Sequence, residues 1–243
     1  MSAIPAIELR KADIAQDPAA RAVLCDVSWG VQPGDFWVIT GAHGSGKSIL
    51  LETMAGVRPC ASGELCWFGQ PVTTQSLSSS NSTALRRRVG MVFEGGGRVF
   101  GDLSVAGNLA LPISYHEGVA IEDAMQRTTP LREALDIERM AGVSAGRIGR
   151  AWMQRVALGR ALALGPEVLL LDNPVGGLDA RNTVWWRTFL QALSKGHPAV
   201  GGRPITLVVS TDDARLWDGD GHRFGEVRDR RWVPLTSAAG TGD

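Results

Sequence analysis

The residues best suited to chemistry form one glycine-rich segment in the first quarter of the chain. It reads Gly41, Ala42, His43, Gly44, Ser45, Gly46, Lys47 and Ser48, which fits the pattern G-x-x-x-x-G-K-[ST]. In such a loop, glycines let successive backbone N–H groups point inward and surround phosphate groups. Lys47 would reach the β- and γ-phosphates of a nucleotide, and the Ser48 hydroxyl would ligate magnesium. The alternative is a chance match in a chain that contains 30 glycines.

A second candidate is Asp172, which ends the apolar run Glu167–Asp172. A carboxylate at the end of a buried strand can reach a phosphate-bound magnesium ion through water. The alternative is an aspartate that only caps the following turn. With a phosphate loop elsewhere in the chain, the pattern favours a metal-holding role for Asp172.

The segments around the loop predict the elements that position it. A turn at Pro33–Gly34 leads into a strand at Phe36–Thr40, and a helix over Lys47–Ala55 ends before Gly56. This order of strand, glycine loop and helix is the context that a phosphate loop requires. Other segments predict strands at Val89–Phe93, Glu167–Asp172 and Ile205–Ser210, helices at Ile121–Arg127, Leu131–Met140 and Thr183–Leu193, and an exposed loop at Thr73–Thr83.

Strands that are apolar on both faces and alternate with helices predict an α/β fold with a mostly parallel sheet. The helical pattern over about residues 102–160 predicts a helical subdomain inserted into that core. We expect a single domain over residues 1–233 and a flexible tail over residues 234–243. The tryptophans at Trp29, Trp37, Trp67, Trp185 and Trp186 favour core or interface packing over base stacking.

The composition excludes several classes of protein. Lys plus Arg and Asp plus Glu both number 25, so the basic surplus of a typical nucleic-acid binder is missing. The three cysteines, Cys25, Cys60 and Cys66, form no CxxC pair and indicate neither a disulfide framework nor a zinc site. No run of 18 apolar residues and no signal peptide occurs, so we expect a cytoplasmic protein without direct membrane insertion.

Several segments together resemble ABC ATPases. Met153–Leu162, Val168–Asp172 and Gly176–Ala180 follow one another in the order and spacing of that family. Ala22–Gly34 resembles the strand pair before the family's phosphate loop, and Arg86–Phe93 resembles the run into its Q-loop. The resemblance covers roughly residues 7–232. Within it, residues 94–116 look most like ATPases of lipid-trafficking importers of the Mla or Mce type.

The resemblance implies a P-loop NTPase core with an N-terminal antiparallel β region and an inserted helical subdomain. It implies ATP and Mg²⁺ as ligands, with Ser48, Asp172 and Glu94 as candidate magnesium-binding residues and Asp179 in the D-loop. It also implies a head-to-tail dimer with a second cassette, and a membrane-embedded permease that contacts residues 94–111. The protein would then lie on the inner face of the cell membrane.

The departures from the family pattern concern hydrolysis. The glutamate that should follow Asp172, the family's general base, is Asn173. The switch histidine is replaced by Thr211, and the Q-loop glutamine by Glu94. An amide has no basic lone pair, so Asn173 can orient a water molecule but cannot deprotonate it.

Two further departures concern contacts with the nucleotide. The signature loop falls at Ile148–Trp152, where Gly149 replaces a phosphate-contacting serine, Arg150 replaces a glycine and Ala151 follows. No aromatic residue lies near Lys11–Asp13, where the family stacks one on adenine.

These residues leave three hypotheses open. The first is an ATP-binding subunit of an ABC transporter with weak hydrolysis, which powers or gates a permease for lipid or phospholipid trafficking. The second is an inactive nucleotide-binding pseudo-ATPase that regulates or stabilises the transporter assembly. The third is a soluble ABC protein unrelated to transport.

Overall fold

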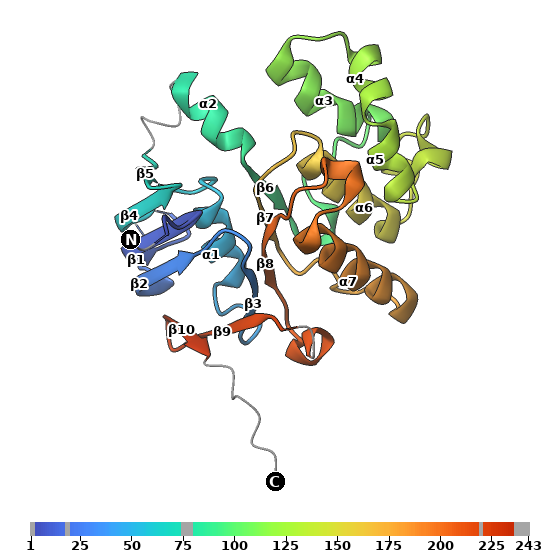
Figure 1. The fold of residues 1–243 in the computed structure, drawn as a ribbon. Helices are drawn as coiled ribbons and strands as arrows, with labels where there is room; N and C mark the ends of the chain where they lie inside the picture. Colours follow the sequence, from blue (N-terminus) through green and yellow to red (C-terminus); the bar gives the residue numbers. More distant parts are fainter. Residues whose placement is uncertain (1–2, 18–19, 74–79, 219–220, 236–243) are drawn as a thin grey trace. The chain divides into compact units, whose positions relative to one another are not determined.

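The computed structural model describes residues 3–17, 20–73, 80–218 and 221–235, and these form two compact units (Figure 1). The first unit combines residues 1–85 with residues 206–243, and the second consists of residues 86–205. The first unit is thus built from both ends of the chain, and the second from the segment between them.

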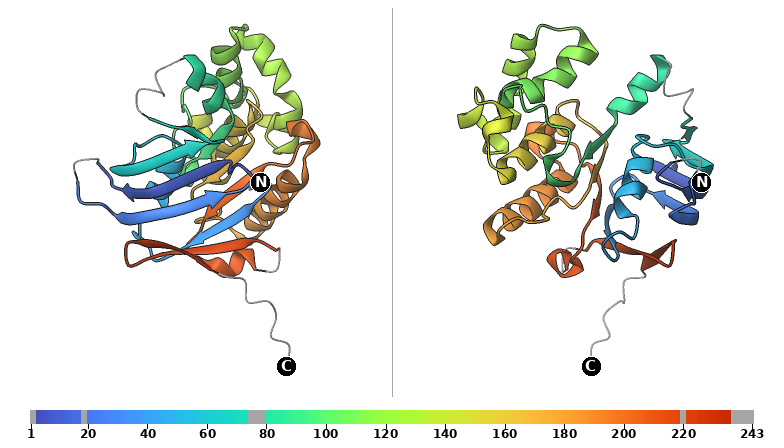
Figure 2. Two further views of the ribbon diagram at one scale, coloured as in Figure 1. Left: turned by 60° about the vertical axis from the view of Figure 1, so that its left-hand side comes forward. Right: turned by 180° about the vertical axis from the view of Figure 1, so that it is seen from behind.

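The first unit contains a four-stranded antiparallel sheet near the N-terminus. Its strand order is β2 (Leu24–Val31), β1 (Ile7–Ile14), β4 (Ser62–Trp67) and β5 (Gln70–Pro71). The blue and cyan arrows of these strands lie side by side in the left view of Figure 2. The sheet is the predicted N-terminal antiparallel β region.

The other strands of the first unit form the sheet segment that carries the glycine-rich loop. Strand β3 (Phe36–Thr40) pairs in parallel with both β8 (Thr206–Ser210) and β9 (Arg223–Arg228), and β10 (Arg231–Leu235) runs antiparallel to β9. Every residue of β8 and all but the last of β3 are buried, as expected for strands covered on both faces. Helix α1 (Lys47–Met54) follows the loop.

The second unit pairs β6 (Val89–Val92) in parallel with β7 (Val168–Leu171), which is entirely buried. Its helices appear in green to orange in the right view of Figure 2. They are α3 (Val105–Glu117), α4 (Ile121–Arg127), α5 (Thr129–Ala134), α6 (Arg150–Leu162) and α7 (Ala180–Lys195). Parallel strands combined with helices confirm the predicted α/β class with a helical subdomain.

The tryptophans named above largely pack in the core. Trp29 and Trp37 are buried, and their rings lie 5.3 Å apart by centroid in an edge-on arrangement. Trp67 is buried and donates its Nε1 hydrogen to the Met54 carbonyl at 2.8 Å. Trp186 is buried with Phe189, Leu190 and Leu193 along one face of α7, at the spacing of an amphipathic helix. Trp185 is only half-buried and stacks on Phe189.

The helix predicted over Leu131–Met140 is wrong in its length, because α5 ends at Ala134. Asp136 adopts a left-handed conformation with φ of 64°. The Asp136 N–H donates to the Glu133 carbonyl, and the Ile137 N–H donates to the Arg132 carbonyl. This is a Schellman motif, which usually has glycine at the left-handed position, so the aspartate gave a weak stop signal.

Two other predictions differ from the structure at segment ends. The exposed loop predicted over Thr73–Thr83 overlaps α2, a helix over Ser80–Arg87, in which only the last four residues, Ala84–Arg87, are good helix formers. Residues 74–79 of that loop lie outside the described residues. The predicted tail begins at Pro234, but Pro234 and Leu235 belong to β10, and residues 236–243 lie outside the described residues.

Candidate functional site

The glycine-rich loop has the backbone conformation that its glycines permit. Gly41, Gly44 and Gly46 have φ values of 145°, 75° and 107°, a region that side chains with a Cβ rarely adopt. A Cβ added to Gly41 would lie 2.5 Å from the Val227 carbonyl oxygen, and one added to Gly46 would lie 2.7 Å from a methyl carbon of Val23. Glycine is therefore required in this loop for two reasons: the positive φ angles, and the lack of space for a Cβ atom at residues 41 and 46.

Lys47 is the first residue of α1, and its side chain reaches back to the start of the loop. Its side chain is 7% exposed, and its Nζ atom donates to the carbonyl oxygens of Gly41 at 2.8 Å and Ala42 at 3.0 Å. The same Nζ lies 3.0 Å from Oδ1 of Asp212. The amine therefore bridges the two ends of the loop while it contacts a carboxylate.

The loop also offers groups that suit a phosphate. The Ser45 hydroxyl is buried and has no hydrogen-bond partner among the described residues. Helix α1 begins after Gly46 without a capping side chain within the described structure, so its first N–H groups can meet an anion. Ala42, His43 and Gly44 are exposed, and Ser48 is half-buried. A cation, a helix N-terminus and an orphaned hydroxyl together fit a bound phosphate group.

Asp212 is a residue that the sequence motifs did not single out, although it follows Thr211. Because a bound phosphate would compete with its carboxylate for Lys47, Asp212→Asn is expected to tighten ATP binding. An ion pair whose acid is half-exposed is worth about 0.2–1 kcal/mol, so a gain of up to about fivefold is expected in calorimetry. Asp218→Asn, which makes the same charge change at an exposed residue, should leave the affinity unchanged. Weaker binding by Asp212→Asn would instead show that Asp212 supports the nucleotide.

Thr211, at the predicted position of the switch histidine, is buried next to Asp212. Its N–H donates to the Ile39 carbonyl at 2.9 Å. Its hydroxyl donates to the Asp213 carbonyl at 3.1 Å and accepts from the Asp213 N–H at 3.1 Å. The hydroxyl is thus engaged in its own turn.

In the second unit, Asp172 and Asn173 follow β7 directly. Asp172 is 5% exposed, and its N–H donates to the Val92 carbonyl at 2.9 Å. The Asn173 side-chain nitrogen donates to Oε1 of Glu94 at 3.0 Å, which brings two of the predicted site residues together. Asn173 has a left-handed backbone with φ of 43°, a conformation that asparagine tolerates better than most residues.

The residues predicted to bind magnesium can be compared with the coordination that this ion prefers. Within the described part of the chain, no group of three or more His, Cys, Asp and Glu side chains gathers around one point. Magnesium commonly keeps several waters and binds through one or two protein ligands plus substrate phosphates. Each predicted ligand, Ser48 in the first unit and Asp172 and Glu94 in the second, carries an oxygen of the kind that magnesium binds.

The predicted signature loop lies at the start of α6. Gly149 is the N-cap residue of that helix, and Arg150 and Ala151 form its first turn. The Arg150 guanidinium donates to the Gly176 carbonyl at 3.3 Å. The departure at Arg150 therefore produces a contact within the same unit.

Asp179, in the predicted D-loop, caps α7. Its carboxylate accepts from the backbone N–H of Asn182 at 2.8 Å and from the Asn182 side chain. These bonds lower the pKa of the Asp179 carboxyl, with the backbone bond the larger cause, so it remains charged as a cap.

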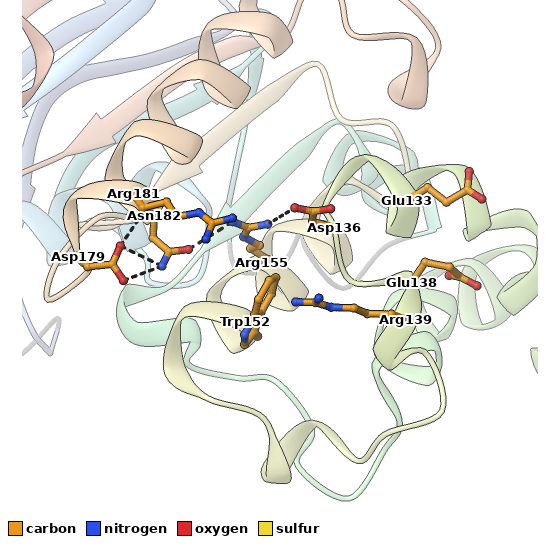
Figure 3. A pocket seen from close by; sticks show the side chains of 9 residues that line it. All are labelled: Glu133, Asp136, Glu138, Arg139, Trp152, Arg155, Asp179, Arg181 and Asn182. Atoms are coloured by element: carbon orange, nitrogen blue, oxygen red, sulfur yellow. Dashed lines mark hydrogen bonds and ion pairs between the residues drawn. The ribbon is translucent and has the colours of Figure 1, made fainter.

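A cavity of about 700 Å³ lies beside this cap, and Figure 3 shows its lining side chains. Arg155 is central: it contacts Asn182 at 3.3 Å and Asp136 at 3.4 Å and lies over the Trp185 ring at 3.7 Å. Trp152 also lines the cavity, 4.7 Å from the Arg155 guanidinium. The sequence motifs did not single out Arg155 or Asn182. These contacts give both residues a structural role around the Asp179 cap.

The chain is similar to known ATP-binding proteins. Residues 24–176 match the family model described as ABC transporter. The chain is 34% identical over 186 residues to the sulfate/thiosulfate import ATP-binding protein CysA of Caulobacter vibrioides, covering 75% of this chain and 51% of that protein. It is 32% identical over 202 residues to the nickel import ATP-binding protein LarO of Lactiplantibacillus plantarum, covering 83% and 80%. The chain thus spans about half the length of the first relative and most of the second.

The fold is also similar to that of a solved ABC transporter cassette. The solved dimeric structure of MJ0796, a bacterial ABC transporter cassette, aligns with a TM-score of 0.79 and 25% identity, covering 95% of this chain and 99% of that one. None of the helices in the described ranges is both long and apolar enough to cross a membrane. The matching family model, the relatives and the shared fold lead to one conclusion: the chain belongs to the ABC transporter family and has the fold of its ATP-binding cassettes.

Proposed function

We propose that this chain is the ATP-binding subunit of an ABC transporter and that it hydrolyses ATP slowly. The observation that carries the proposal is the loop at residues 41–48, in which buried Lys47, the orphaned Ser45 hydroxyl and the start of α1 converge. Lys47 would bind the β- and γ-phosphates, and Ser48 would hold magnesium. The family resemblance adds Asp172 and Glu94 as further candidate magnesium ligands. Bound magnesium would neutralise charge on the phosphates and orient them.

Slow turnover follows from the amide at Asn173. A positioned general base typically contributes 10²–10⁴-fold to a rate, and Asn173 cannot accept a proton from water near neutral pH. Thr211 carries no charge that could replace a switch histidine, and its hydroxyl is engaged with Asp213. Binding groups are thus better preserved than groups for hydrolysis.

The partners belong to the same proposal. A second cassette, either the same chain or a homologue, would complete a dimer, as in the dimeric MJ0796 cassette that shares this fold. A permease subunit would span the membrane and contact residues 94–111, which places this chain on the inner face of the cell membrane. No nucleic-acid partner is proposed, since the net charge is zero.

Lipid or phospholipid trafficking is the proposed process, and it rests on the segment at residues 94–116. The relatives' names concern the import of sulfate or thiosulfate and of nickel. Co-purification with the permease and a transport assay in proteoliposomes would separate these cargoes. Movement of a labelled phospholipid supports the proposal, whereas import of sulfate or nickel by the same complex contradicts it.

The decisive experiment is calorimetry with ATP and magnesium, followed by turnover measured alone and with the permease. We expect binding, with turnover well below the median enzyme rate of about 10 s⁻¹. Binding without any turnover would favour the alternative function, a pseudo-ATPase that stabilises or regulates the transporter. A protein that binds no ATP would contradict both.

A further inference from the structure

The start of strand β2 borders the glycine-rich loop at the end where helix α1 begins. A Cβ added to Gly46 would lie 2.7 Å from a methyl carbon of Val23, which is only half-buried. From this end, the Lys47 side chain reaches back to the Gly41 carbonyl at the start of the loop. In such loops the lysine meets the β- and γ-phosphates, whereas the backbone cradles the α- and β-phosphates. We therefore expect the α-phosphate, and the nucleoside attached to it, on the side of Gly46 and Val23.

A tight turn from the C-terminal part of the same unit carries Arg230. Asp229 and Arg230 form the two-residue connection between β9 and β10, and the flanking Arg228 and Arg231 are paired. Both turn residues have a positive φ, 48° and 60°, as a type I′ turn requires. Glycine is the usual residue at the second position, and a long side chain there costs backbone strain. Strain of this kind is concentrated at functional sites, so the contacts of the Arg230 side chain are informative.

The Arg230 side chain reaches the residue that precedes Val23. Its Nη2 atom donates to the Ala22 carbonyl at 2.7 Å and to the Cys25 sulfur at 3.3 Å. The Cys25 N–H in turn donates to the Arg230 carbonyl at 2.8 Å, which ties the turn to the start of β2. Arg230 stays exposed despite these contacts. Its guanidinium is therefore held beside Val23, with surface left for a ligand.

The chemistry of this corner suits the flat face of a nucleobase. A guanidinium is planar and weakly hydrated, and it stacks on aromatic rings and on bases. Val23 adds an apolar surface at the edge of the loop. Strands β1 and β2 contain one aromatic residue, Trp29, and its ring is buried against Trp37 and Trp232. Among these groups, Arg230 is the one that offers an open, flat surface.

We propose that Arg230 stacks on the base of the bound nucleotide and that Val23 packs against the same base. This inference rests on the proposed function and concerns the same site. Stacking uses the face of the base, which every base offers, and reads none of its edge groups. The site is therefore expected to accept guanine as well as adenine. Arg230 contacts no reacting atom, so it sets the affinity for the nucleotide and not the chemistry of hydrolysis.

Calorimetry on the full chain with magnesium tests this inference with three ligands: ATP, GTP and tripolyphosphate, which lacks a base. Wild type should bind ATP and GTP within about tenfold of each other. Arg230→Ala should weaken the binding of both by about 5- to 150-fold, the loss expected for one stacked base. Its affinity for tripolyphosphate should stay within about twofold of the wild type. Arg231→Ala, which removes the same charge from the neighbouring exposed residue, should bind all three ligands like the wild type.

A second variant separates stacking from charge. Arg230→Lys keeps the positive charge and a hydrogen-bond donor but lacks the planar group, so it should lose most of the affinity that Arg230→Ala loses. Retained binding of tripolyphosphate shows that each variant folds. Wild-type ATP affinity in either variant, or equal losses for ATP and tripolyphosphate, would overturn the inference. A wild type that prefers ATP to GTP by more than about 100-fold would overturn it as well. A wild type that binds neither nucleotide would instead overturn the proposed function.

Discussion

Lys47→Ala is expected to weaken ATP binding by about 10- to 150-fold. The buried amine would donate a charge-assisted hydrogen bond to the phosphates, and such bonds are worth about 1.5–3 kcal/mol. The substitution also removes the two bonds from Nζ to the Gly41 and Ala42 carbonyls, which loosens the loop before any ligand arrives. Titration calorimetry with ATP and magnesium measures the change.

The control for this prediction is Lys195→Ala, which removes the same charge from an exposed position in the last turn of α7. It should bind ATP as tightly as the wild type. Urea unfolding without nucleotide measures the free energy of unfolding, and shows how much of the weaker ATP binding by Lys47→Ala comes from a less stable fold. Equal affinities for wild type and Lys47→Ala would mean that the loop is not a phosphate site.

ATP with magnesium is expected to convert the purified protein into a long-lived dimer. If turnover falls 10²–10⁴-fold below about 10 s⁻¹, each ATP persists for roughly 10 s to 1,000 s. The family resemblance implies that ATP hydrolysis reopens the closed dimer. Slow hydrolysis is therefore expected to keep the dimer closed for longer. In a homodimer both sites contain Asn173 and Arg150. Neither site then has the glutamate or the signature-loop glycine of the family pattern.

Size-exclusion chromatography with light scattering follows this conversion. The matched sample is Lys47→Ala at the same ATP concentration, which should stay monomeric if it binds too little nucleotide. A wild type that remains monomeric although calorimetry shows saturation would rule out long-lived closure. A simple nucleotide-binding monomer would then describe the protein better.

The sequence predicted the elements around the glycine-rich loop well, because their local structure depends on residues that are close together in the sequence. Strand β3 has the predicted bounds, and α1 ends one residue before the predicted end. The glycines at residues 41, 44 and 46 adopt left-handed backbone angles, which follows from their lack of a Cβ.

Contacts between segments far apart in the sequence could not be predicted in the same way. The Lys47–Asp212 ion pair depends on the pairing of β3 with β8, and the Glu94–Asn173 contact depends on the pairing of β6 with β7. Local patterns indicate that strands exist but not which strands are neighbours. Likewise, the end of α5 depends on a left-handed aspartate at residue 136, which composition hardly signals.

Because the first unit combines segments from both ends of the sequence, its folding depends on the order of synthesis. Strand β3, which leads into the phosphate loop, pairs with β8 and β9, and the Val227 carbonyl closes against Gly41. A ribosome must therefore add roughly 180 residues after β3 before its partner β9 exists, which takes roughly 10–40 s at about 5–20 residues per second. During that interval an apolar strand lacks its neighbours and is exposed to aggregation. A nascent chain that stops before β8 would lack the strands that pair with β3 beside the glycine-rich loop. Nucleotide binding is therefore expected only after translation has passed β9.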